Sequence, residues 1–138
     1  MPKLFGLNVL AVLVASVVFY LIGWLWYGVV FKDLWLALTR VTEADAAASS
    51  GPIWYVYGFV ITVFQVVGIG LVMKWKNAAG LNAAVITAVI LWIVFALPFV
   101  GYGYVYSVAH SEKLLLLDAG HLLVGWVVSA AVLALMKA

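Results

Sequence analysis

The segment 114–136 constrains the fold of this chain more than any other. It is long and apolar enough to cross a bilayer as a helix, yet it carries Asp118 and His121 near its first end. A charged side chain in such a helix costs about 2.5–3.5 kcal/mol on insertion scales, so it usually faces protein or water rather than lipid. One arc of the helix holds four polar or small residues: Asp118, His121, Gly125 and Ser129. This arc predicts that the helix packs against other membrane spans.

The composition places the whole chain in a lipid bilayer. Of its 138 residues, 69% are hydrophobic and 9% are charged, whereas a soluble domain is about half apolar and a quarter charged. Seven basic and five acidic residues are too few for the clustered basic face of a nucleic-acid-binding protein. The absence of cysteine excludes disulfides, thiolate metal sites and cysteine nucleophiles.

Four apolar segments predict an all-α fold, an integral membrane four-helix bundle that forms a single domain. They are residues 4–30, 52–73, 81–100 and 114–136. The first is longer than the apolar core of a signal peptide and ends in bulky aromatic residues where cleavage would require small ones. We therefore expect it to be retained as a span.

Individual residues predict how the spans pack. Gln65 lies near the middle of the second span, and because an amide in hydrocarbon needs hydrogen-bond partners, it is expected to point into the bundle. Ala11 and Ala15 form a small-residue pair that predicts the packing face of the first span. Pro98 removes a backbone hydrogen bond and predicts a kink, and the Gly/Tyr alternation at 101–106 predicts a flexible segment.

The longest polar connection, residues 31–51, begins with an interfacial segment, and Thr42 is predicted to cap a short helix within it. Four spans put both termini on one side of the membrane. That side holds four basic residues and no acidic ones: Lys3, Lys74, Lys76 and Lys137. The other side holds three basic residues and all five acidic ones. The positive-inside rule then predicts that both termini are cytoplasmic.

Several short motifs resemble those of a family of small bacterial membrane proteins known as domain of unknown function 1761 (DUF1761). The first is the Gly-Trp-Leu-Trp-Tyr-Gly run at 23–28, followed by Phe-Lys-Asp-Leu-Trp at 31–35. The second half of the family pattern is similar to Ala-Leu-Pro at 96–98 and Leu-Asp-Ala-Gly at 117–120. The chain departs from the pattern at Val29, where the family often has proline. The resemblance implies four spans and a bacterial inner membrane, and it implies no activity.

Asp118 and His121 are the first candidates for a functional site. They lie one helical turn apart, close enough to bond directly or through water. A carboxylate that orients an imidazole raises its basicity, so the pair is typical of proton handling. In the structural alternative, Asp118 pins the entry of the fourth span and His121 donates to a neighbouring carbonyl.

The aromatic residues are the second signal, because ten of the fourteen tryptophans and tyrosines map to the acidic side and only Trp75 marks the other interface. An aromatic belt normally lines both interfaces, so this excess also predicts a cup for an apolar or cationic ligand. The candidate ligand-binding residues of this cup and its rim are Asp118, His121, Gln65, Trp26, Tyr27, Trp54 and Tyr102.

We predict no catalytic residues, no metal site and no cofactor. Two histidines, His110 and His121, rarely suffice for haem, pigment or zinc. Ser107, Ser111 and the histidines match no fixed hydrolase motif.

Three classes of function remain open at this point. The first is a structural or interaction protein that binds itself or serves as an accessory subunit of a larger membrane complex. The second is a binding protein for a lipophilic small molecule, and the third is a membrane enzyme or proton carrier that uses Asp118 and His121.

Overall fold

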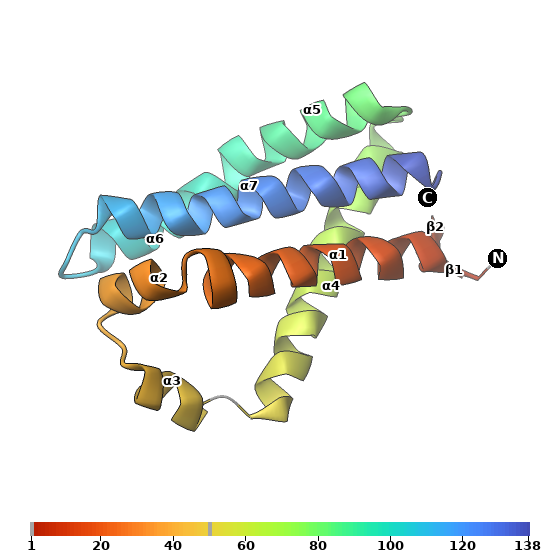
Figure 1. Ribbon diagram of the computed structural model, residues 1–138. Coiled ribbons are helices and arrows are strands. Elements are labelled where there is room, and N and C mark those ends of the chain that lie inside the picture. The colour runs from red at the N-terminus through yellow and green to blue at the C-terminus, as the bar shows by residue number, and fades with distance from the viewer. Residues whose placement is uncertain (1, 50) are drawn as a thin grey trace.

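The computed structural model describes residues 2–49 and 51–138, which are helical except for a short hairpin and the connecting turns (Figure 1). The all-α prediction is confirmed. In chain order the elements are β1 (Lys3–Leu4), β2 (Leu7–Asn8), α1 (Val9–Leu25), η1 (Trp26–Val30), α2 (Lys32–Thr39), α3 (Glu43–Ser49), α4 (Pro52–Trp75), α5 (Leu81–Leu91), η2 (Trp92–Ala96), α6 (Leu97–Tyr106) and α7 (Glu112–Leu135). Here η1 and η2 are π-helical turns that continue α1 and α5.

Four continuous helical stretches are long and apolar enough to cross a membrane, as predicted. They are Val9–Val30, Pro52–Trp75, Leu81–Tyr106 and Glu112–Leu135. The protein is a multi-pass membrane protein whose apolar helices fit a lipid bilayer.

The first span begins at Val9, later than the predicted start at residue 4. The preceding residues form the antiparallel β1–β2 hairpin instead. Its turn places Gly6 at φ +81°, a conformation that interrupts a helix and that glycine adopts without strain. The Asn8 side chain then accepts a hydrogen bond from the Leu10 amide (3.0 Å) and caps the helix.

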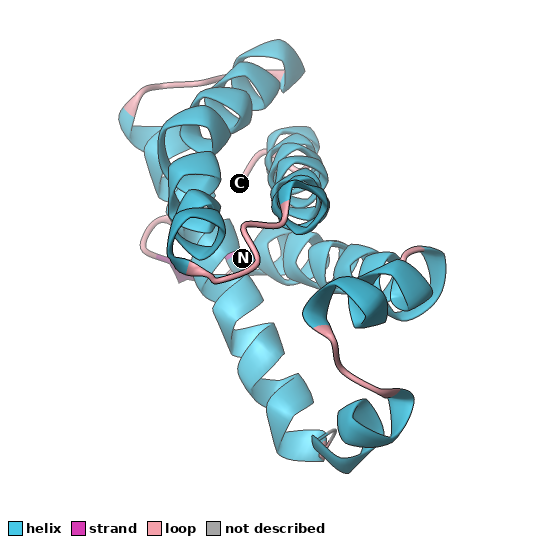
Figure 2. Cartoon of the chain, turned by 90° about the vertical axis from the view of Figure 1, so that its left-hand side faces the viewer, coloured by secondary structure: helices cyan, strands magenta, loops and turns pink. Residues whose placement is uncertain are grey.

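Helix α7 lies at the centre of the molecule, with α1 on one side and the α5–α6 stretch on the other (Figure 1). These helices extend along one another. Helix α4 instead crosses them steeply, and its first half leaves the group, as the view turned by 90° also shows (Figure 2). The termini and the α4–α5 turn lie at one end of the molecule.

The core is built from the small residues that the sequence indicated. Ala11 and Ala15 of α1 are fully buried, which confirms the predicted packing face. The Phe19 ring lies against Gly125 of α7, where a Cβ atom would overlap it. Gln65 points into the molecule, because its Oε1 accepts a hydrogen bond from Trp126 Nε1 (2.8 Å).

The third span remains helical past its proline. Where a kink was predicted at Pro98, the structure has the π-helical turn η2 directly upstream, a common way to accommodate a missing backbone donor. Residues 101–106, where a flexible segment was predicted, are helical, because α6 continues to Tyr106. Tyr102 and Tyr106, one turn apart, stack with ring centroids 6.1 Å apart and support the helix despite its glycines.

The connection between α1 and α4 contains two short helices. Thr42 Oγ1 accepts from the Asp45 amide (3.0 Å), so the predicted cap of α3 is confirmed. Lys32 of α2 pairs with Glu43 of α3 across 3.0 Å. The hydrogen bond to Glu43 raises the pKa of Lys32.

Candidate functional site

Asp118 and His121, near the start of the last span, contact the aromatic residues at the end of the first span. Tyr27 of η1 donates its hydroxyl hydrogen to Asp118 Oδ1 of α7 at 2.6 Å, the short distance of a charge-assisted bond. An Asp118–His121 bond was one of the two interpretations of the sequence, and the other was that Asp118 pins the entry of the fourth span. No such bond occurs in residues 2–49 and 51–138, because the phenol from the neighbouring span reaches the carboxylate. Asp118 therefore ties α7 to the end of α1.

His121 is enclosed by aromatic rings. The ring centroids of Phe19, Trp26 and Tyr27 lie 5.6, 6.2 and 5.0 Å from that of His121. Its Nε2 atom is buried and has no hydrogen-bond partner in the described part of the chain. Gly23 faces this nitrogen so closely that an added Cβ would lie 3.0 Å from it. The glycine is therefore what allows the imidazole to fit against α1.

Two indoles fix the backbone of α7 beside this group. Trp26 Nε1 donates to the Leu117 carbonyl (3.0 Å), and Trp92 Nε1 donates to the Ala119 carbonyl (2.8 Å). Each tryptophan is the first residue of a π-helical turn, η1 or η2. Because residues two apart on a helix point to roughly opposite sides, the two indoles hold α7 from both flanks.

The structure brings together four of the seven residues predicted to bind a ligand: Asp118, His121, Trp26 and Tyr27. The other three lie elsewhere. Gln65 pairs with Trp126, Trp54 is 61% exposed on the first half of α4, and Tyr102 is 63% exposed on α6. A cup that uses all seven side chains is not formed.

Phe19, Gly23 and Trp92 belong to the site and were not predicted as site residues. Gly23 stands in the 23–28 run that carries the family resemblance, which was its only signal. Trp92 lies within the third span, away from the membrane interface where tryptophan is commonest. An indole at that depth requires an acceptor, and this requirement was the available signal.

Tyr27, Asp118 and His121, with the rings of Phe19 and Trp26 around them, form a partly buried polar joint. It contains one phenol–carboxylate hydrogen bond and one imidazole nitrogen without a partner, packed among rings. The part of the chain that the structure describes contains no group of three potential metal-ligating His, Asp or Glu side chains. His110 lies in the exposed turn before α7, where its Nδ1 lies 2.9 Å from the Tyr104 carbonyl oxygen.

The chain matches the family model described as protein of unknown function (DUF1761) over residues 10–134. The chain belongs to the DUF1761 family. Every residue of the joint lies within the matched region, from Phe19 to His121. The comparison with curated proteins gave no match, and neither did the comparison with solved structures. The match therefore assigns the chain to a family, and it assigns no activity to the chain.

Proposed function

We propose that this protein resides in a bacterial inner membrane with both termini in the cytoplasm and acts as an interaction protein that associates with a second copy of itself. Accessory binding to another membrane protein is the related possibility. The surface in question is the first half of α4, which leaves the other spans (Figures 1 and 2).

The observation that supports this proposal is a full helical turn with little intramolecular packing, although the Tyr20 hydroxyl of α1 donates to the Tyr55 carbonyl (2.9 Å). Five consecutive side chains at the start of α4 are all more than half exposed: Ile53 (54%), Trp54 (61%), Tyr55 (55%), Val56 (59%) and Tyr57 (51%). Since five residues exceed one turn, side chains on every side of this part of the helix are more than half exposed. Three of the five are aromatic, the residue class that is enriched at protein interfaces.

Single cysteines test the proposal directly, because the chain has none of its own. Tyr57→Cys and Ile61→Cys lie on the exposed part of α4, whereas Ile86→Cys is a matched control on α5 that is also more than half exposed. After oxidation in native membranes, we expect disulfide-linked dimers from the α4 positions and not from Ile86→Cys. Equal cross-linking at all three positions, or a purely monomeric mass in mild detergent, would contradict self-association.

The unpaired His121 nitrogen favours a second candidate, a proton carrier or membrane enzyme that uses Asp118 and His121. A buried imidazole next to a phenol–carboxylate pair has the groups that proton transfer needs. Asp118→Asn and His121→Ala should then abolish a cellular phenotype while the protein stays folded. Wild-type behaviour of both variants would exclude this candidate.

A further inference from the structure

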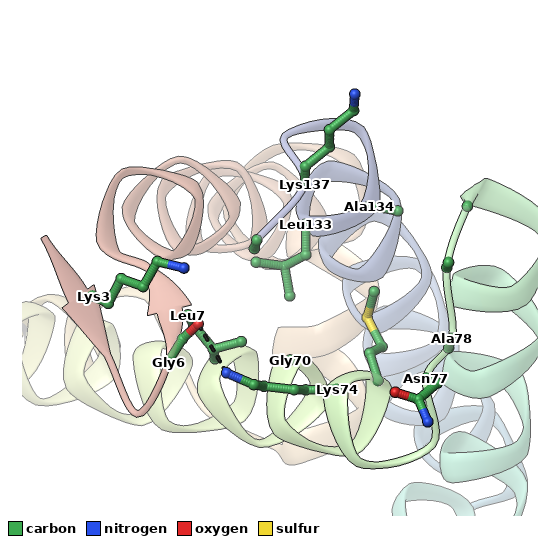
Figure 3. A pocket seen from close by; sticks show the side chains of 14 residues that line it. Lys3, Gly6, Leu7, Gly70, Lys74, Asn77, Ala78, Leu133, Ala134 and Lys137 are labelled. Atoms are coloured by element: carbon green, nitrogen blue, oxygen red, sulfur yellow. Dashed lines mark hydrogen bonds between the residues drawn. The ribbon is translucent and has the colours of Figure 1, made fainter. Parts of the chain in front are cut away.

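A basic cavity lies at the end of the molecule opposite the polar joint. It has a volume of about 450 Å³ and opens between the N-terminal hairpin, the end of α4, the α4–α5 turn and the end of α7 (Figure 3). Its polar lining comes from three lysines and an asparagine: Lys3, Lys74, Lys137 and Asn77. None of the described residues that line it has an acidic side chain, and Ala138 is also among them.

The lysines differ in how they face the cavity. Lys3, from the hairpin, and Lys74, from α4, extend towards the same space, whereas the amine of Lys137 points away from it at the rim (Figure 3). Lys74 Nζ donates to the Gly6 carbonyl at 3.2 Å. The side-chain ammonium groups of Lys3 and Lys137 have no hydrogen-bond or ion-pair partner among residues 2–49 and 51–138.

Capping of the adjacent helix ends does not account for these charges. Lysines often neutralise the free carbonyls at a helix C-terminus. Here the chain itself satisfies such carbonyls, since the Ala78 amide donates to Met73 O (2.8 Å) and the Ala138 amide to Leu133 O (3.0 Å). The ammonium groups of Lys3 and Lys74 thus remain without an anionic side-chain partner.

Below the lysines the cavity is apolar. Leu7 and Leu133 are almost fully buried, Met73 is largely buried, and Gly70 leaves the space that the two leucines occupy. A cationic opening over an apolar floor at the end of membrane spans is complementary to an anionic headgroup with hydrocarbon attached. The cationic opening is also complementary to a phosphate group that carries no hydrocarbon chain.

We propose that this cavity binds a phosphate group, held by Lys3 and Lys74 with Asn77 as an additional donor. The phosphate belongs either to an anionic phospholipid or to a free phosphate compound. Ammonium groups bind phosphate through charge-assisted hydrogen bonds, which an amide replaces only weakly. The proposal does not depend on self-association, so failure of one leaves the other standing.

The test uses the full chain in detergent, with native mass spectrometry for lipid binding and the unfolding midpoint for inorganic phosphate. Phosphatidylglycerol should bind more tightly than phosphatidylcholine. Lys3→Gln and Lys74→Gln should each weaken phosphatidylglycerol binding about tenfold. Glutamine at residue 74 retains a donor for the Gly6 carbonyl, so the hairpin contact can persist without the charge.

Lys76→Gln is the matched control, because it removes the same charge from the same end of the molecule and Lys76 does not line the cavity. It should bind like the wild type; an equal loss would indicate general attraction to anionic surfaces and overturn the proposal. If inorganic phosphate alone raises the midpoint of the wild type but not of Lys3→Gln, free phosphate is the source. The proposal is overturned if the wild type neither prefers phosphatidylglycerol nor changes its unfolding midpoint with inorganic phosphate.

Discussion

The Phe19 ring occupies the space that the missing side chain of Gly125 leaves on α7. This contact lies on the arc of α7 that also carries Asp118 and His121. Phe19 touches His121 as well, with ring centroids 5.6 Å apart. One aromatic side chain therefore links the small-residue packing of the core to the polar joint.

Gly125→Ala should lower the free energy of unfolding by about 1–3 kcal/mol, because the new methyl group overlaps the Phe19 ring in a closely packed core. Gly68→Ala is the control, since a Cβ there meets nothing within 4 Å. Reversible unfolding in mixed micelles measures both. Adding Phe19→Leu should recover part of the loss in the Gly125→Ala variant; no recovery would show that the overlap is not the cause.

Tyr27→Phe should destabilise the protein by about 1–3 kcal/mol, since it removes the donor of a hydrogen bond to a partly buried carboxylate and leaves Asp118 unpaired. The matched control is Tyr106→Phe, because Tyr106 is 80% exposed on α6 and its hydroxyl has no hydrogen bond in the described residues. The two variants are compared by their unfolding midpoints in the same detergent. Equal midpoints would show that the bond contributes little.

Among the elements, the two π-helical turns are what place the tryptophans on α7. A π-helical turn shifts the register of a helix and is often found at functional positions. In this protein both turns begin at the tryptophan that donates to an α7 carbonyl. The backbone irregularity and the side-chain contact therefore occur together in both spans.

Trp92→Phe should destabilise the packing of the third span on α7 by about 1–2 kcal/mol, because it removes the indole donor from Ala119 O and some buried volume. Trp24→Phe is the control, since Trp24 is mostly exposed on the first span. Unfolding midpoints again give the comparison. A larger effect from Trp24→Phe would contradict the role assigned to the indole bond.

Sequence patterns predicted those elements whose determinants are local. The alanine pair of α1, the Thr42 cap of α3 and the inward side chain of Gln65 all follow from a few neighbouring residues. The hairpin before Val9 was missed because its apolar residues read as a continuation of the span. The helix at 101–106 was missed because its two glycines indicated flexibility, whereas the stacking of two tyrosines one turn apart, which supports the helix, was not considered.

The candidate site was predictable in its members but not in its pairing. Asp118 and His121 stood out because they are polar in an apolar helix, and Trp26 and Tyr27 because they end the first span. Which of them bond depends on the register of η1 against α7, and no local pattern encodes that register. The Tyr27–Asp118 bond could therefore be seen only in the structure.

For the whole molecule, the distribution of charge predicts sidedness. The end with the termini and the α4–α5 turn carries lysines without acidic residues, and α3 lies away from it (Figure 1). The steep crossing of α4 was not predicted, because hydropathy identifies a span but gives no angle between helices. Its exposed first half became visible only from the packing.

Two single-cysteine variants test the sidedness. Lys76→Cys lies at the basic end and Ala44→Cys in α3, and both positions are exposed. With cytoplasmic termini, a membrane-impermeant maleimide added to intact cells should label Ala44→Cys and not Lys76→Cys until the cells are lysed. The reverse pattern would invert the proposed topology.

Leu7 and Leu133 both lie over Gly70, so residues from the first and last parts of the chain meet at the second span. The hairpin is synthesised long before α7, and during translation it has only part of its final surroundings. We therefore expect this end of the protein to mature only after α7 has been synthesised. A large fusion placed directly before the hairpin should slow that final step, whereas the same fusion in the α3 connection should not.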